Sequence, residues 1–170
     1  KYGYIDKDGN VVVPIVYDDV SYFYGGICVV RKRMKYGVYN LKGEQIIPVI
    51  YNEIFFPFFE DNQGYPISTF VRKDDKYFIL DVKGKNVNNE YYDDIFWICD
   101  KNIFFVNKND RYGVVDINGN TILPIVFDGF VHGMAPLYRH YLFLNEKRFY
   151  IEEIGLPNKR RDIIKSIMQR

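Results

Sequence analysis

A short segment that occurs four times along the chain constrains the fold more than any other feature. The segment reads Lys-Tyr-Gly-Tyr-Ile-Asp at Lys1–Asp6, and versions of it begin again at Lys35, Lys76 and Arg111. Each version is followed, at fixed offsets, by a turn glycine, then a proline or asparagine, then an aromatic residue. These landmarks are Gly9, Gly43, Gly84 and Gly119; Pro14, Pro48, Asn89 and Pro124; Tyr17, Tyr51, Tyr92 and Phe127. The chain therefore contains tandem copies of a unit of roughly 35 residues, which indicates a repeat architecture.

The turn residues within each copy predict a β-hairpin. Asp8-Gly9 is a dipeptide that accepts positive φ at both central positions of a type I′ turn, and the other copies carry similar pairs. A two-residue loop here would pair Ile5 with Val12, within segments that are good strand formers. Pro14 is then expected to end the second strand, because proline cannot donate to a ladder.

A second pair of strands is predicted in each copy. In the first copy, residues 17–23 form one strand, Gly25-Gly26 turns the chain, and residues 27–30 form the other. A unit of about three or four short strands cannot bury its apolar face alone, so neighbouring copies must stack. We therefore expect an all-β fold of tandem β-hairpin repeats stacked into a curved or superhelical array. A small β-propeller is the alternative, since four strands per unit also describe a blade.

The predicted organisation is a single repeat domain over residues 1–170. The repeats are assigned to residues 1–34, 35–75, 76–110 and 111–147, with a degenerate cap hairpin and a helix at 148–170. The third repeat departs from the pattern, because Phe78 replaces the glycine of the recurring segment and Asn89 replaces the proline. A fifth, partial copy begins at Arg148 with no Asp-Gly turn after it, and a degenerate last unit is what a capping role requires.

A helix is predicted at the end of the chain. Asn158 is a suitable N-cap after Pro157, and the apolar residues that follow fall on one helical stripe. These residues are Ile163, Ile164, Ile167 and Met168. We expect the helix to cover the exposed end of the sheet array, and the alternative is a contact with another chain.

The recurring residues resemble the WG-repeat family of bacterial proteins. The clearest copy comprises Lys1–Asp6, Gly9, Pro14, Tyr17–Val20 and Phe23–Val30, and the resemblance extends over about residues 1–140. One departure is tyrosine at each position where the family often has tryptophan, which preserves a large amphipathic ring. The resemblance implies an interaction module without catalytic residues. Some members also look like aromatic hairpin repeats that bind cell-wall choline or glycan.

Composition narrows the classes of partner. Lysine and arginine number 23 against 22 acidic residues, so no strong field favours nucleic acid. No apolar run approaches the roughly 20 residues of a membrane span. The two cysteines, Cys28 and Cys99, are too few for a disulfide framework and are expected to be buried free thiols. The compartment and the oligomeric state stay open.

The sequence offers little for catalysis or for a cofactor. The acidic pairs Asp18-Asp19 and Asp93-Asp94 recur at one offset, whereas a catalytic pair is needed once, so we assign them a structural role in an Asx-type turn. His132 and His140 are the only histidines and have no neighbouring cysteine, so no zinc site is expected. We predict that the chain is not an enzyme and requires neither a metal nor another cofactor.

The most individual feature is an insertion in the second repeat, within residues 55–69. Its start is unusually apolar for a loop. The residues proposed for binding are Phe55, Phe56, Phe58, Phe59 and Tyr65. If these rings are exposed they form a binding patch, because aromatic residues dominate interface energetics; if they are buried they fill a local core.

Two binding functions follow, and the recurring tyrosines distinguish them. The leading hypothesis is protein–protein interaction, in which the tyrosines between repeats are buried and the contact surface lies elsewhere. The alternative is carbohydrate or cell-wall binding through solvent-facing pockets between repeats. The tyrosines concerned are Tyr2, Tyr36, Tyr77 and Tyr112.

Overall fold

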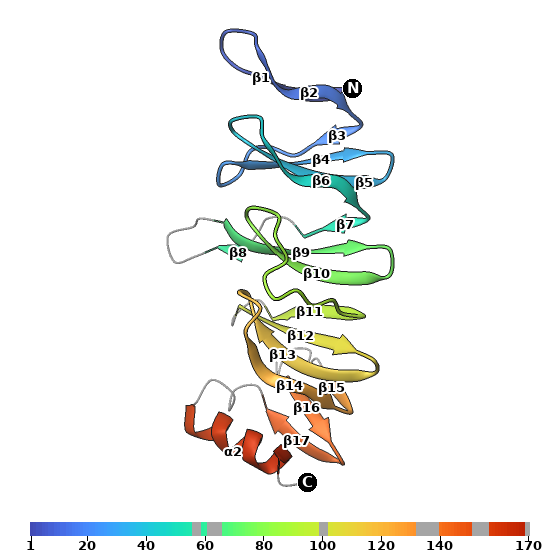
Figure 1. Cartoon of the computed structure of the whole chain (residues 1–170), viewed down its shortest axis with the longest axis vertical. Coiled ribbons are helices and arrows are strands. Elements are labelled where there is room, and N and C mark those ends of the chain that lie inside the picture. The colour runs from blue at the N-terminus through green and yellow to red at the C-terminus, as the bar shows by residue number, and fades with distance from the viewer. Residues whose placement is uncertain (56–58, 61–65, 99–101, 132–139, 151–156, 169–170) are drawn as a thin grey trace. The chain divides into compact units, whose positions relative to one another are not determined.

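The described part of the chain is all-β apart from the helix near its end, as predicted. The computed structural model describes residues 1–55, 59–60, 66–98, 102–131, 140–150 and 157–168. Within these ranges the strands form small antiparallel sheets, which Figure 1 shows in order along the chain. Contacts divide the chain into two compact units, Lys1–Tyr91 and Tyr92–Arg170.

The first unit contains three of these sheets. One is the hairpin of β1 (Tyr2–Ile5) and β2 (Val11–Tyr17). The second is a meander of β3 (Asp19–Val20), β4 (Ile27–Lys32), β5 (Lys35–Asn40) and β6 (Gln45–Tyr51). In the third, β9 (Pro66–Lys73) pairs with β7 (Glu53–Ile54), β8 (Phe59–Glu60) and β10 (Lys76–Asp81).

The second unit contains two sheets and the helix. Its four-stranded meander consists of β11 (Asp94–Ile98), β12 (Ile103–Lys108), β13 (Arg111–Asp116) and β14 (Thr121–Phe127). A three-stranded sheet follows, made of β15 (Gly129–Val131), β16 (Tyr141–Leu144) and β17 (Lys147–Tyr150). The helix α2 spans Pro157–Met168.

The meander sheets cross the borders of the sequence repeats. In the sheet of β3 to β6, the first two strands come from the first repeat and the last two from the second. The sheet of β11 to β14 joins the third and fourth repeats in the same way. Consecutive repeats are therefore held together by strand pairing as well as by side-chain packing.

Neighbouring sheets within each unit share a hydrophobic core. Val13 of β2 clusters with Cys28 and Val30 of β4, so the first two sheets are packed together. Ile47 of β6 likewise clusters with Val71 of β9. The expected stacking of repeats is thus present within the first unit.

The turn after each recurring segment has the same structure in all four copies, but it is not the predicted type I′ turn. Of Asp8 and Gly9 only the glycine has positive φ, at 85°, and the Gly9 N–H donates to the Asp6 carbonyl at 3.1 Å. The Asp6 N–H donates to the Asn10 carbonyl at 2.9 Å. The loop is therefore one residue longer than predicted, and Ile5 pairs with Val11 rather than with Val12.

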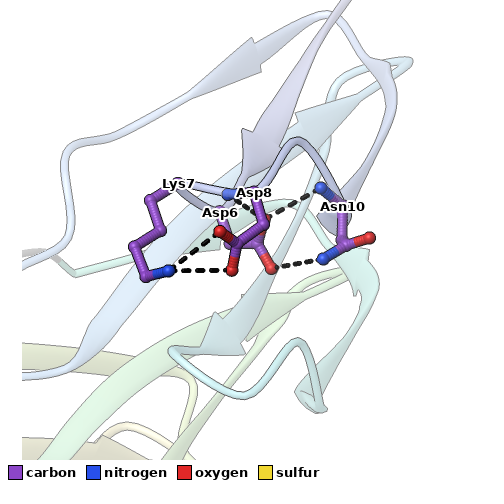
Figure 2. A network of polar contacts seen from close by, with 4 residues as sticks. All are labelled: Asp6, Lys7, Asp8 and Asn10. Atoms are coloured by element: carbon purple, nitrogen blue, oxygen red, sulfur yellow. Dashed lines mark hydrogen bonds and ion pairs between the residues drawn. The ribbon is translucent and has the colours of Figure 1, made fainter.

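An acidic or amide side chain determines this turn geometry. Oδ1 of Asp6 accepts the backbone N–H groups of Asp8 and Asn10 at 2.9 and 2.8 Å, as Figure 2 shows. The same pair of hydrogen bonds recurs at the equivalent residues of the other copies, which are Asn40, Asp81 and Asp116. The side chain thereby satisfies two backbone donors that the tight turn leaves without ladder partners.

The prolines lie inside strands and do not end them. β2 continues through Pro14 to Tyr17, and its register with β1 shifts between the pairs Tyr2–Tyr17 and Tyr4–Val13. β6 and β14 show the same shift around their prolines. A bulge places proline where no ladder N–H is required, so the chain continues as strand instead of stopping.

The bulge explains why the recurring segment needs glycine. A Cβ atom on Gly37 would lie 2.7 Å from the Ile47 carbonyl oxygen and 2.9 Å from the Val49 nitrogen. Gly3 and Gly113 are crowded by their bulged neighbours in the same way. The third copy has Phe78 at this position. Among the described residues, the edge of β10 opposite β9 has no strand beside it, apart from an isolated bridge between Leu80 and Asn86.

The helix caps the core of the second unit, as predicted. Ile163 is buried in a cluster with Leu123 of β14 and Phe149 of β17, and Ile164 and Ile167 pack against it. The prediction was wrong at Met168, which is exposed, and the helix begins at Pro157 rather than after an N-cap at Asn158. Proline suits the first turn of a helix because it needs no N–H donor there.

One basic side chain fixes the helix to the edge of the sheet. The guanidinium of Arg160 donates to the backbone carbonyls of Ile122 and Thr121, both at 3.0 Å. It thereby satisfies two backbone acceptors of β14, the last strand of its sheet. In the described part of the chain, no helix has the length and apolar character needed to cross a membrane.

Candidate functional site

The recurring carboxylates hold hairpin turns. Oδ2 of Asp18 accepts the backbone N–H of Arg33 at 2.8 Å, in the tight turn between β4 and β5. Asn52, Asp93 and Asp128 accept an N–H from the equivalent turns at 2.9, 2.7 and 2.7 Å. The structural role predicted for these residues therefore holds, but the N–H belongs to the next hairpin and not to a local Asx turn.

The electrostatics of these carboxylates also fit a structural role. A side-chain hydrogen bond from Lys1, with the backbone N–H of Arg33, lowers the pKa of Asp18 to about 2. The N–H of Asn145 and the ion pair with Arg111 lower the pKa of Asp128. Hydrogen bonds from Asn10 lower that of Asp6. These three groups are therefore ionised at neutral pH and unsuited to act as general acids there.

We expect the Asp18→Asn variant to lose part of the acid sensitivity of the first unit. A carboxylate whose folded-state pKa is lowered stabilises the fold above its ordinary pKa of about 4. This contribution disappears as the pH falls toward the folded-state pKa of about 2. Asparagine, which occupies the equivalent position at Asn52, keeps the acceptor but does not titrate.

Urea unfolding followed by circular dichroism, repeated from about pH 6 to about pH 2, measures this effect. The midpoint should fall further for the native chain than for Asp18→Asn, and the extra fall should occur below about pH 4. Parallel curves for the two proteins would contradict the proposed role of Asp18.

The buried thiol offers no nucleophile. Cys28 is a buried free cysteine, as predicted, and burial raises its pKa to about 11. A thiol with so high a pKa stays protonated and unreactive at neutral pH. Cys99 lies outside the described residues. His140 is buried, and His132 lies outside the described residues, as Cys99 does.

One shallow groove lies on the first unit, over the sheet of β3 to β6. It is bordered by Asp19 and Arg31, which approach to 3.7 Å, by Tyr36, and by Ile54 from β7. Its volume is about 210 Å³, below the roughly 300–1,000 Å³ of most small-molecule sites. Within the described residues, no group of three potential metal ligands gathers in one place.

The tyrosines of the recurring segments are mostly packed. Tyr36 lies against the core shared by β6 and β9, and Tyr112 lies against the core of the second unit. The Tyr77 ring is half-buried, with its centroid 6.3 Å from that of Phe70. Tyr2, in the first hairpin, is exposed. These rings do not form a regular series of open aromatic pockets.

The predicted binding residues of the insertion are only partly described. Phe55 is half-buried and its ring stacks on Phe70 at 5.0 Å, while its carbonyl accepts the hydroxyl of Thr69 at 2.7 Å. The backbone of Phe59 pairs with Ser68 in the β8–β9 ladder. The other predicted residues, Phe56, Phe58 and Tyr65, lie outside the described residues.

Among the residues whose exposure is described, the most exposed aromatic side chain lies in the equivalent loop of the first repeat. Tyr22 is 90% exposed, and Tyr24 on the same loop and Leu41 on a neighbouring loop are exposed as well. We call these three residues the tyrosine patch. This patch was not predicted from the sequence, although the run of three aromatic residues from Tyr22 to Tyr24, directly before Gly25-Gly26, was a usable signal.

The backbone beneath the tyrosine patch is firmly held. Phe23, between the two tyrosines, points inward to the Tyr4 ring at 4.7 Å, and the Tyr4 hydroxyl donates to the Ser21 carbonyl at 2.6 Å. The Tyr24 N–H donates to the Ile27 carbonyl at 2.8 Å. The Leu41 N–H donates to Gly26 at 3.1 Å, which joins the two loops of the patch.

Comparison with known families agrees with the repeat pattern. The model of a protein family described as "WG containing repeat" matches residues 2–36, 36–77 and 112–135, which together make up more than half of the chain. The chain belongs to the WG-repeat family. The gap between the matched segments contains the third copy's missing strand, so the sequence and the structure of this WG-repeat protein depart from the pattern at the same place.

Wider comparisons add little to the WG-repeat assignment. No curated protein matches the sequence. A crystal structure of the eukaryotic initiation factor is 11% identical with a TM-score of 0.40, covering 82% of this chain and 42% of that one. A crystal structure of Kluyvelomyces marxianus Hsv2 is 12% identical with a TM-score of 0.36, covering 75% and 45%. The chain spans less than half of either structure, and neither likeness bears on its function.

Proposed function

We propose that this WG-repeat chain is a non-enzymatic protein-binding module and that the tyrosine patch is its contact surface. The observation that carries the proposal is the exposure of Tyr22 on a loop whose backbone is fixed by hydrogen bonds. A rigid tyrosine offers a large amphipathic contact area at little entropic cost, which is why this residue is enriched at binding hot spots.

Two further observations support a protein partner over a glycan or a substrate. Tyr36 and Tyr112 pack against the core and Tyr77 is half-buried, whereas glycan binding between repeats would need these rings open to solvent. The groove over β3 to β6 is small, and the carboxylates with lowered pKa values hold turns. The near balance of acidic and basic residues gives no support to a nucleic-acid partner.

The test removes the patch and leaves the fold unchanged. The triple variant Tyr22→Ser, Tyr24→Ser, Leu41→Ser is compared with Met34→Ser, whose exposed side chain lies on the β4–β5 turn at the other end of the sheet. The immobilised chains are exposed to a soluble extract of the source cells, and retained proteins are quantified by mass spectrometry. In parallel, the same proteins are applied to an oligosaccharide array.

We expect the native chain and Met34→Ser to retain the same protein. The triple variant should retain at least about tenfold less of it, as for the loss of a binding hot spot. Purified to homogeneity, that protein should show the same loss of affinity. Equal retention by all three chains would contradict the role of the patch. Binding to the array that disappears only in the triple variant would assign the patch to a glycan instead.

A further inference from the structure

The groove over the sheet of β3 to β6 has a counterpart in the second unit. The groove is bordered by residues on or next to β3, β4, β5 and β7, and the second unit has the equivalent strands β11, β12, β13 and β15. Asp19 pairs with Arg31 in the first unit, and Asp94 pairs with Asn107 in the second. Because these registers agree, the residues around the two sites can be matched one by one.

Three residues that border the groove are smaller than their counterparts. All three counterparts are phenylalanine, whereas the groove has a serine, a valine and an isoleucine. The fourth position is tyrosine in both units, at Tyr36 and Tyr112. The groove therefore lies where the first unit lacks three aromatic rings. The matched pairs are Ser21 with Phe96, Val29 with Phe105, and Ile54 with Phe130.

In the second unit, the counterpart rings fill the site. The Phe130 ring lies 4.1 Å from the Phe105 ring and 5.2 Å from the Phe96 ring, measured between centroids. It also lies 6.3 Å from the Tyr112 ring. The corresponding space in the first unit is the open groove of about 210 Å³. The chain itself thus shows which chemical group a site of this geometry accommodates.

The residue pair that includes Ser21 carries a ring elsewhere in the chain. In the sheet of β9, the equivalent residues are Phe55 and Phe70, whose rings stack with centroids 5.0 Å apart. In the sheet of β15 to β17 they are Val131 and Tyr141. Among the described sheets that contain this pair, only that of β3 to β6 has no ring there. The groove is therefore a local departure from the pattern of the fold.

The rim of the groove carries a cation that its counterpart lacks. Arg31 occupies the position of Asn107, and its guanidinium lies 3.7 Å from the carboxylate of Asp19. The Arg31 side chain is one-third exposed, so a bound group can reach it. A guanidinium is attracted to the negative face of an aromatic ring, whereas an aliphatic side chain offers no such face. The charge at the rim therefore complements an aromatic occupant.

We propose that the groove binds one aromatic side chain of a partner protein, in the space that phenylalanine rings fill in the second unit. The volume is below that of most small-molecule sites, but pockets that receive a single anchoring ring are typical of protein–protein hot spots. The proposal rests on the protein-binding role proposed above but not on the tyrosine patch, because no residue of that patch borders the groove.

The probe is N-acetyl-phenylalanine amide, and N-acetyl-leucine amide is its aliphatic control. Each is titrated into the full 170-residue chain with ¹³C-labelled valine and isoleucine methyl groups, which are observed by NMR. A bound ring shifts the methyl resonances that it faces through its ring current, which leucine does not have. Val29 and Ile54 report on the groove, and Ile50, an exposed residue of β6 that does not border the groove, is the reference.

The variants fill the groove with residues that the chain uses in the second unit. Ile54→Phe introduces the counterpart of Phe130, and Ser21→Phe introduces the counterpart of Phe96. The second variant provides the test if the first does not fold, and thermal unfolding checks both. Ile50→Phe makes the same exchange outside the groove and is the matched control.

We expect saturable shifts at Val29 and Ile54 in the native chain and at Val29 in Ile50→Phe, at roughly millimolar probe because one ring makes few contacts. Ile54→Phe and Ser21→Phe should bind the probe at least tenfold more weakly. The proposal is overturned if no shift saturates, if the leucine amide binds as tightly, or if the filled variants bind as the native chain does. Tyr22→Ser should bind the probe normally, so this proposal and that of the tyrosine patch fail separately.

A retention experiment with the same variants tests whether the ring belongs to a protein. From a soluble cell extract, the native chain and Ile50→Phe should retain a protein that Ile54→Phe retains at least tenfold less. The phenylalanine amide should displace that protein, and the leucine amide should not. If no retained protein depends on the groove, although the probe binds there, the occupant is a free aromatic molecule and the proposed protein partner is overturned.

Discussion

The Gly37→Ala variant should destabilise the first unit by about 3 kcal/mol, at the upper end of what overpacking usually costs. The added methyl group would lie 2.7 Å from the Ile47 carbonyl oxygen and 2.9 Å from the Val49 nitrogen. Both atoms belong to the bulged backbone of β6, which cannot move away without losing its ladder with β5. The buried cluster beneath, including Val38 and Ile47, would be disturbed as well.

A matched glycine separates crowding from backbone conformation. Gly9 has a φ of 85° but no atom within 4 Å of an added Cβ, so Gly9→Ala should cost only about 1 kcal/mol, the penalty for a left-handed conformation. Native-state hydrogen exchange at the amides of Val38 and Ile47 reports the stability of the first unit. If both variants lower protection equally, the close approach of the bulge is not the reason for the glycine.

The repeat made much of this fold predictable from the sequence, and the errors have local causes. An Asp-Gly pair fits both a type I′ turn and the longer turn that forms, and the decisive residue is Asp6, two positions earlier. Its recurrence as Asn40, Asp81 and Asp116 was a signal for that choice. Pro14 indicates only that the ladder has no N–H donor at this residue. A bulge removes the need for that donor just as the end of a strand does, so proline alone does not distinguish the two.

Pairing across repeat borders was harder to predict. The turn between β4 and β5 has positive φ at both Arg33 and Met34, residues that rarely indicate such a turn. The carboxylate of Asp18, 15 residues earlier, accepts the Arg33 N–H, and local sequence patterns do not contain this contact between the middle and the end of a repeat. The degenerate Phe78 was recognised, but only the crowding around Gly37 explains why a strand is lost there.

The candidate site was less predictable than the fold, because exposure depends on tertiary packing. The binding site was predicted in the phenylalanine-rich insertion, and Phe55, the predicted residue whose side chain is described, is half-buried on Phe70. Tyr22 was placed in a strand over residues 17–23, but β3 ends at Val20 and Tyr22 extends from a loop. Loop aromatic residues are hard to separate from core ones while the strand boundaries are uncertain by a few residues.

Phe105→Ala should destabilise the second unit by about 4 kcal/mol, as expected for deleting a fully buried phenylalanine ring. Phe105 is 1% exposed, and its ring stacks on Phe130 with centroids 4.1 Å apart. The deletion opens a cavity in a core that includes Val114 and Leu123, strand residues whose backbone ladders limit collapse into the space.

The matched control lies directly opposite in the same ladder. Phe96 pairs with Phe105 and also contacts Phe130, at 5.2 Å, but it is 44% exposed. Phe96→Ala should therefore cost about 1 kcal/mol or less. Trp97, the single tryptophan of the chain, pairs with Phe104 in this sheet, so its fluorescence during urea unfolding reports the second unit. Similar free energies of unfolding for the two variants would mean that the stability of this sheet comes from its ladders. A difference of about 3 kcal/mol would locate it in the buried core around Phe105.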